Sequence, residues 1–179
     1  MLQRFDQLSE VFQKTKYTDA HKELSPSDAL SQAIEMLKGV KGIVYCIGNG
    51  ASGDIASHFS AELMKNCHLA SQTLFNTSLF TSIANDLGYE HTFSHPLEKL
   101  LKPDDLLIAL SGSGKSKNVL RALEVALKIR CPIMTFSGCE WENPLRQKGH
   151  WNAWIDCKEH GMIETLHFFL FHAIIDLWK

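Results

Sequence analysis

The sequence lacks long apolar runs and basic tracts, and its first residues are unlike a signal peptide. No stretch reaches the about 18 consecutive apolar residues of a membrane-spanning helix, and the N-terminus, MLQRFDQLSE, is charged where a signal peptide would be apolar. Lys and Arg total 18 against 20 Asp and Glu, a net charge of -2, without the basic and aromatic clusters that bind nucleic acid. We therefore expect a cytoplasmic protein that binds neither membranes nor nucleic acids.

Cysteines are few, and no two of them form a C-x-x-C pair. The five thiols are odd in number and scattered along the chain: Cys46, Cys67, Cys131, Cys139 and Cys157. A disulfide framework needs an even set in an oxidising compartment, and a thiolate zinc site needs closely spaced pairs. The pattern indicates reduced cytosolic thiols.

Apolar strand-like runs alternate with helical periodicities along the 179 residues. Strands are predicted at 43–47, 72–75, 104–110, 132–136 and 151–157, and helices at 2–16, 25–39, 51–66, 117–129 and 162–178, with helical pieces in 76–86 and 88–101 and a polar linker at 18–22. This alternation predicts a single α/β domain over 1–179 with a parallel sheet. The helical extension 1–38 would pack on partner subunits or cover its own sheet. The C-terminal helix, apolar on nearly every face, indicates burial or a subunit interface.

The stretch from 42 to 66, GIVYCIGNGASGDIASHFSAELMKN, joins an apolar run to a helix through a glycine-rich turn. Such a turn presents backbone N–H groups at a helix N-terminus to an anion, although it also serves close packing alone. His58 and Glu62 follow at i and i+4, on one helix face. They form either a surface pair or two proton-handling or metal-binding groups.

A second turn carries three serines between a strand and a helix. Ser111, Ser113 and Ser116 stand in SGSGKS, where hydroxyls, free N–H groups and the helix dipole suit a phosphate dianion. The end of this motif matches a P-loop, but Ala109 stands where a P-loop needs its first glycine, so a nucleoside triphosphatase is disfavoured. A serine N-cap is the simpler alternative and would need only one of these serines.

Several motifs in order, GNGASGDIASHFSAEL, NDLGYEHTFSHPLEKL, LIALSGSGKSKNVLRAL and ETLHFFLFHAIID, resemble bacterial phosphoheptose isomerases of the sugar isomerase (SIS) fold. The resemblance covers roughly residues 40–176 and is more specific than any single motif. It implies a three-layer αβα sandwich around a five-stranded parallel sheet, assembled as a homotetramer with its sites between subunits.

The resemblance also implies roles for individual residues. The implied substrate- and phosphate-binding residues are Asn49, Gly50, Ser52, Asn85, Asp86, Ser111, Gly112, Ser113, Ser116 and Glu164. One zinc ion per subunit is implied, with ligands His58, Glu62, Glu164 and His172. Glu62 as base and His172 as acid/base partner suit proton transfer through an enediol, and the family assigns the same two residues.

The sequence departs from the family pattern near these residues. Gly112 replaces a threonine and Lys115 an asparagine, and Lys115 either adds a positive charge for phosphate or faces solvent. Gly161 and Met162 replace an Asp-Arg pair, which bears on the choice of sugar. Glu164 replaces a glutamine ligand, keeping an oxygen donor and adding a negative charge.

The spacing of Glu164 and His172 tests the metal site. Eight residues separate them, about 12 Å of helix rise. Either Glu164 lies on the turn before the helix and reaches in, or the two ligands come from different subunits. His167 is a rival ligand, and His167 and His172 could instead be core histidines with satisfied hydrogen bonds.

The preferred function is isomerisation of sedoheptulose 7-phosphate to D-glycero-D-manno-heptose 7-phosphate, for the heptose of lipopolysaccharide or capsule. The alternatives are an isomerase of another sugar phosphate and a non-catalytic SIS regulator, similar to one that binds the replication initiator. The joint presence of His58, Glu62 and His172 argues against a regulator.

Overall fold

One mixed sheet organises the computed structural model, which describes residues 2–20 and 22–178. Its seven strands in the described chain run in the order β2-β1-β7-β6-β5-β3-β4. Their bounds are β1 (Lys16–Asp19), β2 (Glu23–Leu24), β3 (Val44–Ile47), β4 (Ser71–Thr73), β5 (Leu106–Ser111), β6 (Ile133–Gly138) and β7 (Trp151–Ile155). From β7 to β4 the neighbours pair in parallel, whereas β1 is antiparallel to both β7 and β2. The α/β class is confirmed, but the expected five-stranded parallel sheet is corrected to seven strands in a mixed sheet.

Of the two additional strands, β1 spans residues interpreted as the end of a helix and the start of a polar linker, and β2 lies between that linker and the next predicted helix. Tyr17 and Thr18 are both buried, and Tyr17 pairs with Ala153 of β7. The Lys16 ammonium lies 2.6 Å from the Glu23 carboxylate across the hairpin. Because β1 has only four residues and its two central residues are both buried, no two-residue alternation distinguishes it from the helical spacing before it.

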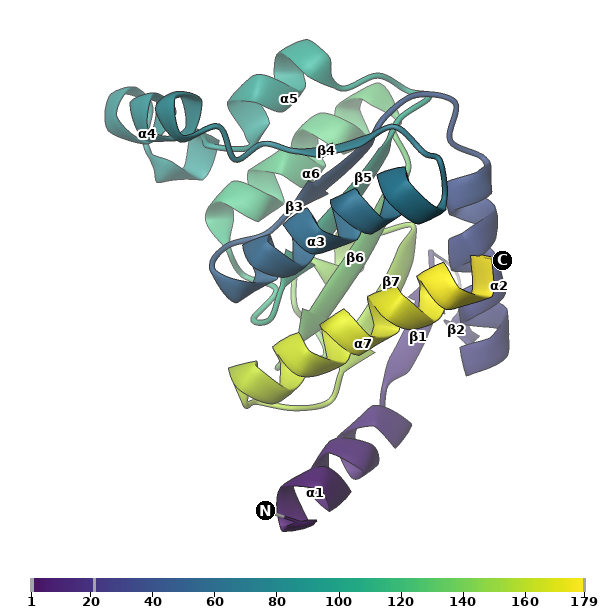
Figure 1. The fold of residues 1–179 in the computed structure, drawn as a ribbon. Helices are drawn as coiled ribbons and strands as arrows, with labels where there is room; N and C mark the ends of the chain where they lie inside the picture. The colour runs from purple at the N-terminus through teal and green to yellow at the C-terminus, as the bar shows by residue number, and fades with distance from the viewer. Residues whose placement is uncertain (1, 21, 179) are drawn as a thin grey trace.

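Helices cover both faces of the sheet (Figure 1). They are α1 (Leu2–Gln13), α2 (Pro26–Lys38), α3 (Ala51–Asn66), α4 (Thr77–Asp86), α5 (Ser94–Leu100), α6 (Lys117–Ile129) and α7 (His160–Trp178), with 3₁₀ turns η1 (Tyr89–His91) and η2 (Arg146–Lys148). One core cluster joins α2, α3 and α7 to one face, and a second joins α5 and α6 to the other. This is the three-layer αβα arrangement that the resemblance implied.

The first two helices are placed differently. Ser25 caps α2 by accepting a hydrogen bond from the Asp28 N–H, and α2 buries Ala29 against its own sheet, where the Trp151 indole N–H donates to the Ala29 carbonyl at 2.9 Å. Thus α2 covers its own sheet, one of the alternatives that the sequence left open. By contrast, α1 projects from the body, touching α7 through an edge-to-face contact of Phe12 with Phe169 (Figure 1).

Helix α7 is buried on one face rather than all round. Ile163, His167 and Ile174 are fully buried, while Phe168 and Phe169 are exposed. By length and composition α7 could cross a membrane, although it is not an unbroken apolar run, because Glu164 and Asp176 lie within it. Its packing against α3 and the sheet is that of the core helix of a folded domain.

We expect Asp105 to be a main support of the central strands. Its buried carboxylate accepts hydrogen bonds from the Ile43 and Lys102 N–H groups, both at 2.7 Å. Asp105→Ala leaves two donors without partners and should lower the free energy of unfolding by about 2–4 kcal/mol in urea titrations. The exposed neighbour provides the control, since Asp104→Ala should change it by less than about 0.5 kcal/mol. Equal effects of the two substitutions would contradict this role.

Candidate active site

Two glycine-containing turns meet at the carboxyl edge of the sheet. The turn 48–53 follows β3 and the turn 111–116 follows β5, and these strands are parallel neighbours. The chain leaves β3 for β4 on one side and returns to β5 on the other, so the strand order reverses between them. In open α/β sheets, ligands bind in the crevice at this switch point.

A reciprocal amide pair ties the two turns together. The Asn49 amide donates to Asn118 Oδ1 at 2.8 Å, and the Asn118 amide donates back to Asn49 Oδ1 at 2.8 Å. The Tyr89 hydroxyl also donates to Asn49 Oδ1, at 2.9 Å, and the Asn118 amide to Thr92 Oγ1, at 3.1 Å. Sequence reasoning missed Asn118, Tyr89 and Thr92. Their only signal was the position of Asn118 in the first turn of a predicted helix.

The hydroxyls of the serine turn make contacts within the turn rather than capping α6. Ser111 Oγ lies 3.0 Å from Ser116 Oγ, and Ser113 Oγ accepts from the Lys115 N–H at 3.2 Å. Ser116 occupies the N-cap position, yet its side chain makes no capping hydrogen bond. The alternative of a serine retained for capping is therefore wrong, and Lys115 is exposed to solvent.

Three further predicted substrate-binding residues, Ser52, Asn85 and Asp86, lie in two different places. Ser52 is buried in the first turn of α3, two residues after Gly50, whose φ of 53° suits glycine. Asn85 and Asp86 end α4, are exposed, and hydrogen-bond to each other at 2.8 Å. Among the described residues, no side-chain hydrogen bond links Asp86 to either glycine turn, so the structure groups Ser52 with the turns but not Asp86.

Helices α3 and α7 bring two of the predicted metal ligands together. The rings of His58 and His172 lie 5.3 Å apart, and Phe168 contacts both rings. A stack of Phe59 on Phe171, with ring centroids 4.0 Å apart, holds the helices next to this pair. The pairing of two histidines 114 positions apart could not be read from spacing alone.

The predicted carboxylates are not gathered around this pair. Glu62 lies one turn after His58 and accepts a short hydrogen bond from the Asn66 amide. Glu164 lies inside α7, not on a turn before it, and is half-buried. Within residues 2–20 and 22–178, no three His, Cys, Asp or Glu side chains gather as a metal-binding group. One chain therefore brings together only the two histidines. Glu62 lies on the same helix face as His58, and Glu164 lies apart from the pair.

His167, the rival ligand, is a core residue. Its ring is fully buried, and its Nε2 lies 3.1 Å from the Ser137 carbonyl, while Nδ1 has no partner. Burial lowers the pKa of His167 to about 4, against the opposing effect of the Ser137 hydrogen bond, so the ring is neutral at pH 7. His167 is therefore a core histidine, as the alternative reading expected, although only one of its ring nitrogens has a hydrogen-bond partner. His172 is not a core histidine, because it is partly exposed beside His58.

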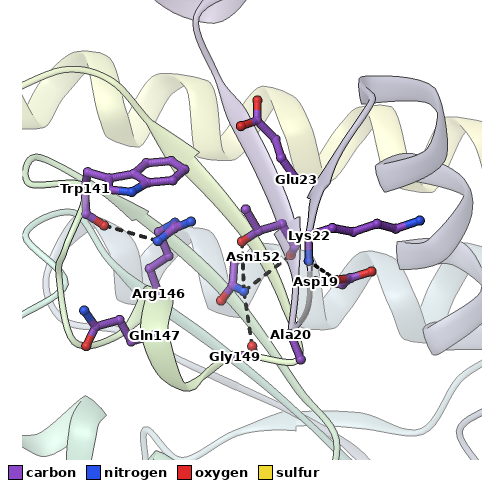
Figure 2. Close-up of a pocket in the computed structure, with 10 residues that line it drawn as sticks. Asp19, Ala20, Lys22, Glu23, Trp141, Arg146, Gln147, Gly149 and Asn152 are labelled. Carbon is purple, nitrogen blue, oxygen red and sulfur yellow. Dashed lines mark hydrogen bonds between the residues drawn. The ribbon is translucent and has the colours of Figure 1, made fainter.

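A cavity of about 450 Å³ lies apart from the predicted site. Figure 2 shows it between the β1–β2 hairpin and the segment that follows β6. The Arg146 guanidinium lies 3.4 Å from the centroid of the Trp141 ring. Its lining residues are Thr18, Asp19, Ala20, Lys22, Glu23, Trp141, Arg146, Gln147, Gly149 and Asn152. None of these is a predicted site residue. The lining includes the basic side chains of Lys22 and Arg146 and the acidic side chain of Glu23. We place the site at the switch point, where the hydroxyls and the helix N-terminus converge.

Comparison with known proteins identifies the class of this chain. The SIS domain family matches residues 5–138, so the chain belongs to the SIS domain family. The resemblance to phosphoheptose isomerases is likewise confirmed. The chain is 34% identical over 152 residues to a phosphoheptose isomerase of Campylobacter concisus, covering 82% of this chain and 79% of that protein. It is 37% identical over 154 residues to a probable phosphoheptose isomerase of Thermoplasma acidophilum, covering 83% and 82%.

A solved structure shares almost the whole fold. Phosphoheptose isomerase GmhA from Neisseria gonorrhoeae superposes with a TM-score of 0.84 at 28% identity, over 99% of this chain and 95% of that one. The likeness therefore includes the hairpin and the N-terminal helix, as well as the α/β core.

The low pKa of His167 makes a prediction about acid stability. The unfolded chain takes up this proton near pH 6.5 and the folded chain only near pH 4, so stability is complete above pH 6.5 and falls as the pH drops towards 4. We expect a loss of about 2–3 kcal/mol from this group between pH 7.5 and 4.5. In urea titrations, His167→Gln should lose less stability over this range than the parent. The exposed His68, replaced in His68→Asn, should leave the parental pH dependence unchanged, and an equal slope for His167→Gln would contradict the assignment.

Proposed function

We propose that this chain is an aldose–ketose isomerase that converts sedoheptulose 7-phosphate to D-glycero-D-manno-heptose 7-phosphate through an enediol. The observation that carries the proposal is the pair of hydroxyls, Ser111 and Ser116, 3.0 Å apart at the start of α6 without capping it. The names of the relatives of this chain suggest the reaction, and the serine turn offers a place for the phosphate of the substrate.

The phosphate is proposed to lie in the serine turn with Ser52 from the neighbouring turn. Ser111, Ser113 and Ser116 offer hydroxyl donors, and the first N–H groups of α6 offer the positive end of the helix dipole. Asn49 and Gly50 are proposed to line the crevice beside Gly112. Asn85 and Asp86 would contact the sugar only after α4 or the substrate brings them closer.

Proton transfer is assigned to Glu62 and His172. In the direction from the ketose, a base removes a proton from C1 while an acid protonates the C2 oxygen, giving the enediol. A proton then returns to C2 as the C1 hydroxyl loses its proton to form the aldehyde. Glu62 is the proposed base and His172 the acid/base partner, each supplying about 10²–10⁴-fold of rate.

The residues present fit a zinc ion in part. Two imidazoles bound at about 2.0–2.1 Å in tetrahedral geometry place their ring centres about 5 Å apart, close to the 5.3 Å between His58 and His172. Glu62 would be the third ligand only after its carboxylate turns from the Asn66 amide towards the histidine pair. We propose that Glu164 completes the set from a second copy, since it lies two turns from His172. When bound, zinc would polarise the sugar carbonyl.

Assembly as a homotetramer is proposed on the same grounds. α7 exposes Phe168 and Phe169 beside the histidine pair, and α1 leaves Phe5 63% exposed. Exposed aromatic side chains gathered on neighbouring helices are typical of protein–protein interfaces. A cytoplasmic location and a place in lipopolysaccharide or capsule heptose synthesis are parts of the same proposal.

The substrate assignment rests on the relatives more than on this chain's own turn. Gly161, Met162 and Glu164 depart from the pattern that the resemblance implies, so another sugar phosphate is the second candidate. Comparing turnover of sedoheptulose 7-phosphate with that of six- and five-carbon ketose phosphates tests the choice.

We predict that Glu62→Gln and His172→Asn each lower kcat by at least about 10²-fold, because each removes a proton-transfer group. Solvent-deuterium incorporation at C2, followed by NMR, should fall with kcat. Bound zinc measured in the same samples separates the roles, since loss of exchange with zinc retained identifies Glu62 as a base rather than a ligand. Exchange at the parental rate in Glu62→Gln would reject Glu62 as the base.

Substitutions at the proposed phosphate site provide a control for the two proton-transfer variants. The double variant Ser111→Ala with Ser113→Ala should raise KM at least about 10-fold, because it removes two phosphate donors. Its kcat should change far less than that of Glu62→Gln. A double variant that binds sugar phosphate as well as the parent would place the phosphate elsewhere.

We predict that the oligomer depends on the exposed aromatic face of α7. Light scattering of the parent at micromolar concentration should give the mass of four chains, and Phe169→Asp should shift it towards smaller species because it places a charge in the interface. Leu127→Asp, on the outer side of α6, is the matched control. A parent that is monomeric at this concentration would refute the assembly.

A further inference from the structure

Gly112 is not required by the backbone of the serine turn. The glycines with positive φ are Gly50, Gly88 and Gly114, and Gly112 is not among them, so a side chain is conformationally allowed there. A Cβ at Gly112 would instead lie 3.0 Å from Nδ1 of His160. The absent side chain at this position therefore makes room for an imidazole.

The start of α7 is packed so that His160 stays above the turn. On the neighbouring strand, the Gly138 N–H donates to the Gly112 carbonyl at 2.9 Å. A Cβ at Gly138 would lie 2.6 Å from Cδ1 of Ile163, which is fully buried. Because His160 precedes Ile163 by three residues, both lie on one face of the helix. Two glycines thus let α7 approach, and Ile163 holds His160 against Gly112.

The His160 imidazole is exposed and has its hydrogen-bonding capacity free. Among the described residues, no side chain or backbone group forms a hydrogen bond or ion pair with it. The other residues of this first turn, Gly161, Met162 and Ile163, offer no polar side chain. His160 is therefore the polar side chain that α7 presents to the serine turn.

We propose that His160 binds the phosphate-bearing end of the sugar phosphate, taking the place that a hydroxyl side chain at position 112 would otherwise occupy. Gly112 and His160 then form a coupled pair that sets how this end of the substrate is held. This inference rests on the proposed function for the identity of the ligand. The pair itself rests on the contact between α7 and the serine turn.

Isothermal titration calorimetry with sedoheptulose 7-phosphate and with inorganic phosphate tests the contact without relying on turnover. We expect His160→Ala to weaken the Kd for the sugar phosphate roughly 3- to 10-fold, the usual effect of one hydrogen bond. His160→Asn, which keeps a donor, should recover part of the loss. The control Lys158→Ala, whose side chain is 85% exposed on the same segment, should bind as the parent does.

A double-mutant cycle tests the coupling. Gly112→Thr should displace the imidazole and weaken binding, whereas Gly112→Thr with His160→Ala gives the hydroxyl room and should bind more tightly than either single variant. Weaker binding of inorganic phosphate by His160→Ala places the contact on the phosphate, and an unchanged phosphate Kd with a weakened sugar-phosphate Kd places it on the adjoining carbon.

Parental affinity in His160→Ala, or strictly additive effects in the cycle, would overturn the inference. If the parent binds the sugar phosphate but does not isomerise it, and His160→Ala still weakens binding, the proposed reaction fails while the His160 assignment stands.

Discussion

The parallel pairing of β3 with β5 is the constraint on which the candidate site depends. Val44 pairs with Leu106 and Ile47 with Ala109, so the strands leave the sheet at nearly the same level and their turns start side by side. The reciprocal Asn49–Asn118 amide pair then joins the turns, satisfying two amide groups that are partly or fully buried. A half-satisfied pair would be costly, which is why this contact rigidifies the edge of the sheet.

On the opposite side of the sheet from α6, aromatic packing determines where the histidines lie. Phe59 and Phe171 stack between α3 and α7, and each is the chain neighbour of a site histidine. The stack therefore positions His58 and His172 without using either ring for stability. His167, on the same helix, is turned into the core, where burial keeps it neutral. Two histidines of one helix thus have different chemistry because only one faces the sheet.

Glycines govern how closely α7 approaches the end of the sheet. At Gly138 a methyl group would overlap Ile163, and at Gly112 it would crowd His160. Gly114 has a different cause, because its φ of 66° favours glycine and a Cβ there would meet Asn143, whose amide donates to the Glu140 carbonyl. Glycine thus serves close packing at Gly112 and Gly138, and both close packing and backbone conformation at Gly114.

The sequence by itself determined the α/β class, the two glycine turns and the helices that carry His58 and His172, because these depend on local periodicity and turn chemistry. It missed the β1–β2 hairpin, whose strands are too short for a period to show. Only the tertiary structure decided that Glu164 stands apart from the histidine pair, that Ser116 does not cap α6 and that His160 lies over Gly112. The contact of His160 with Gly112 joins residues far apart in the chain, and it follows from how α7 packs on the sheet rather than from spacing within any segment. The other two depend on side-chain orientation within α6 and α7, which residue spacing does not determine.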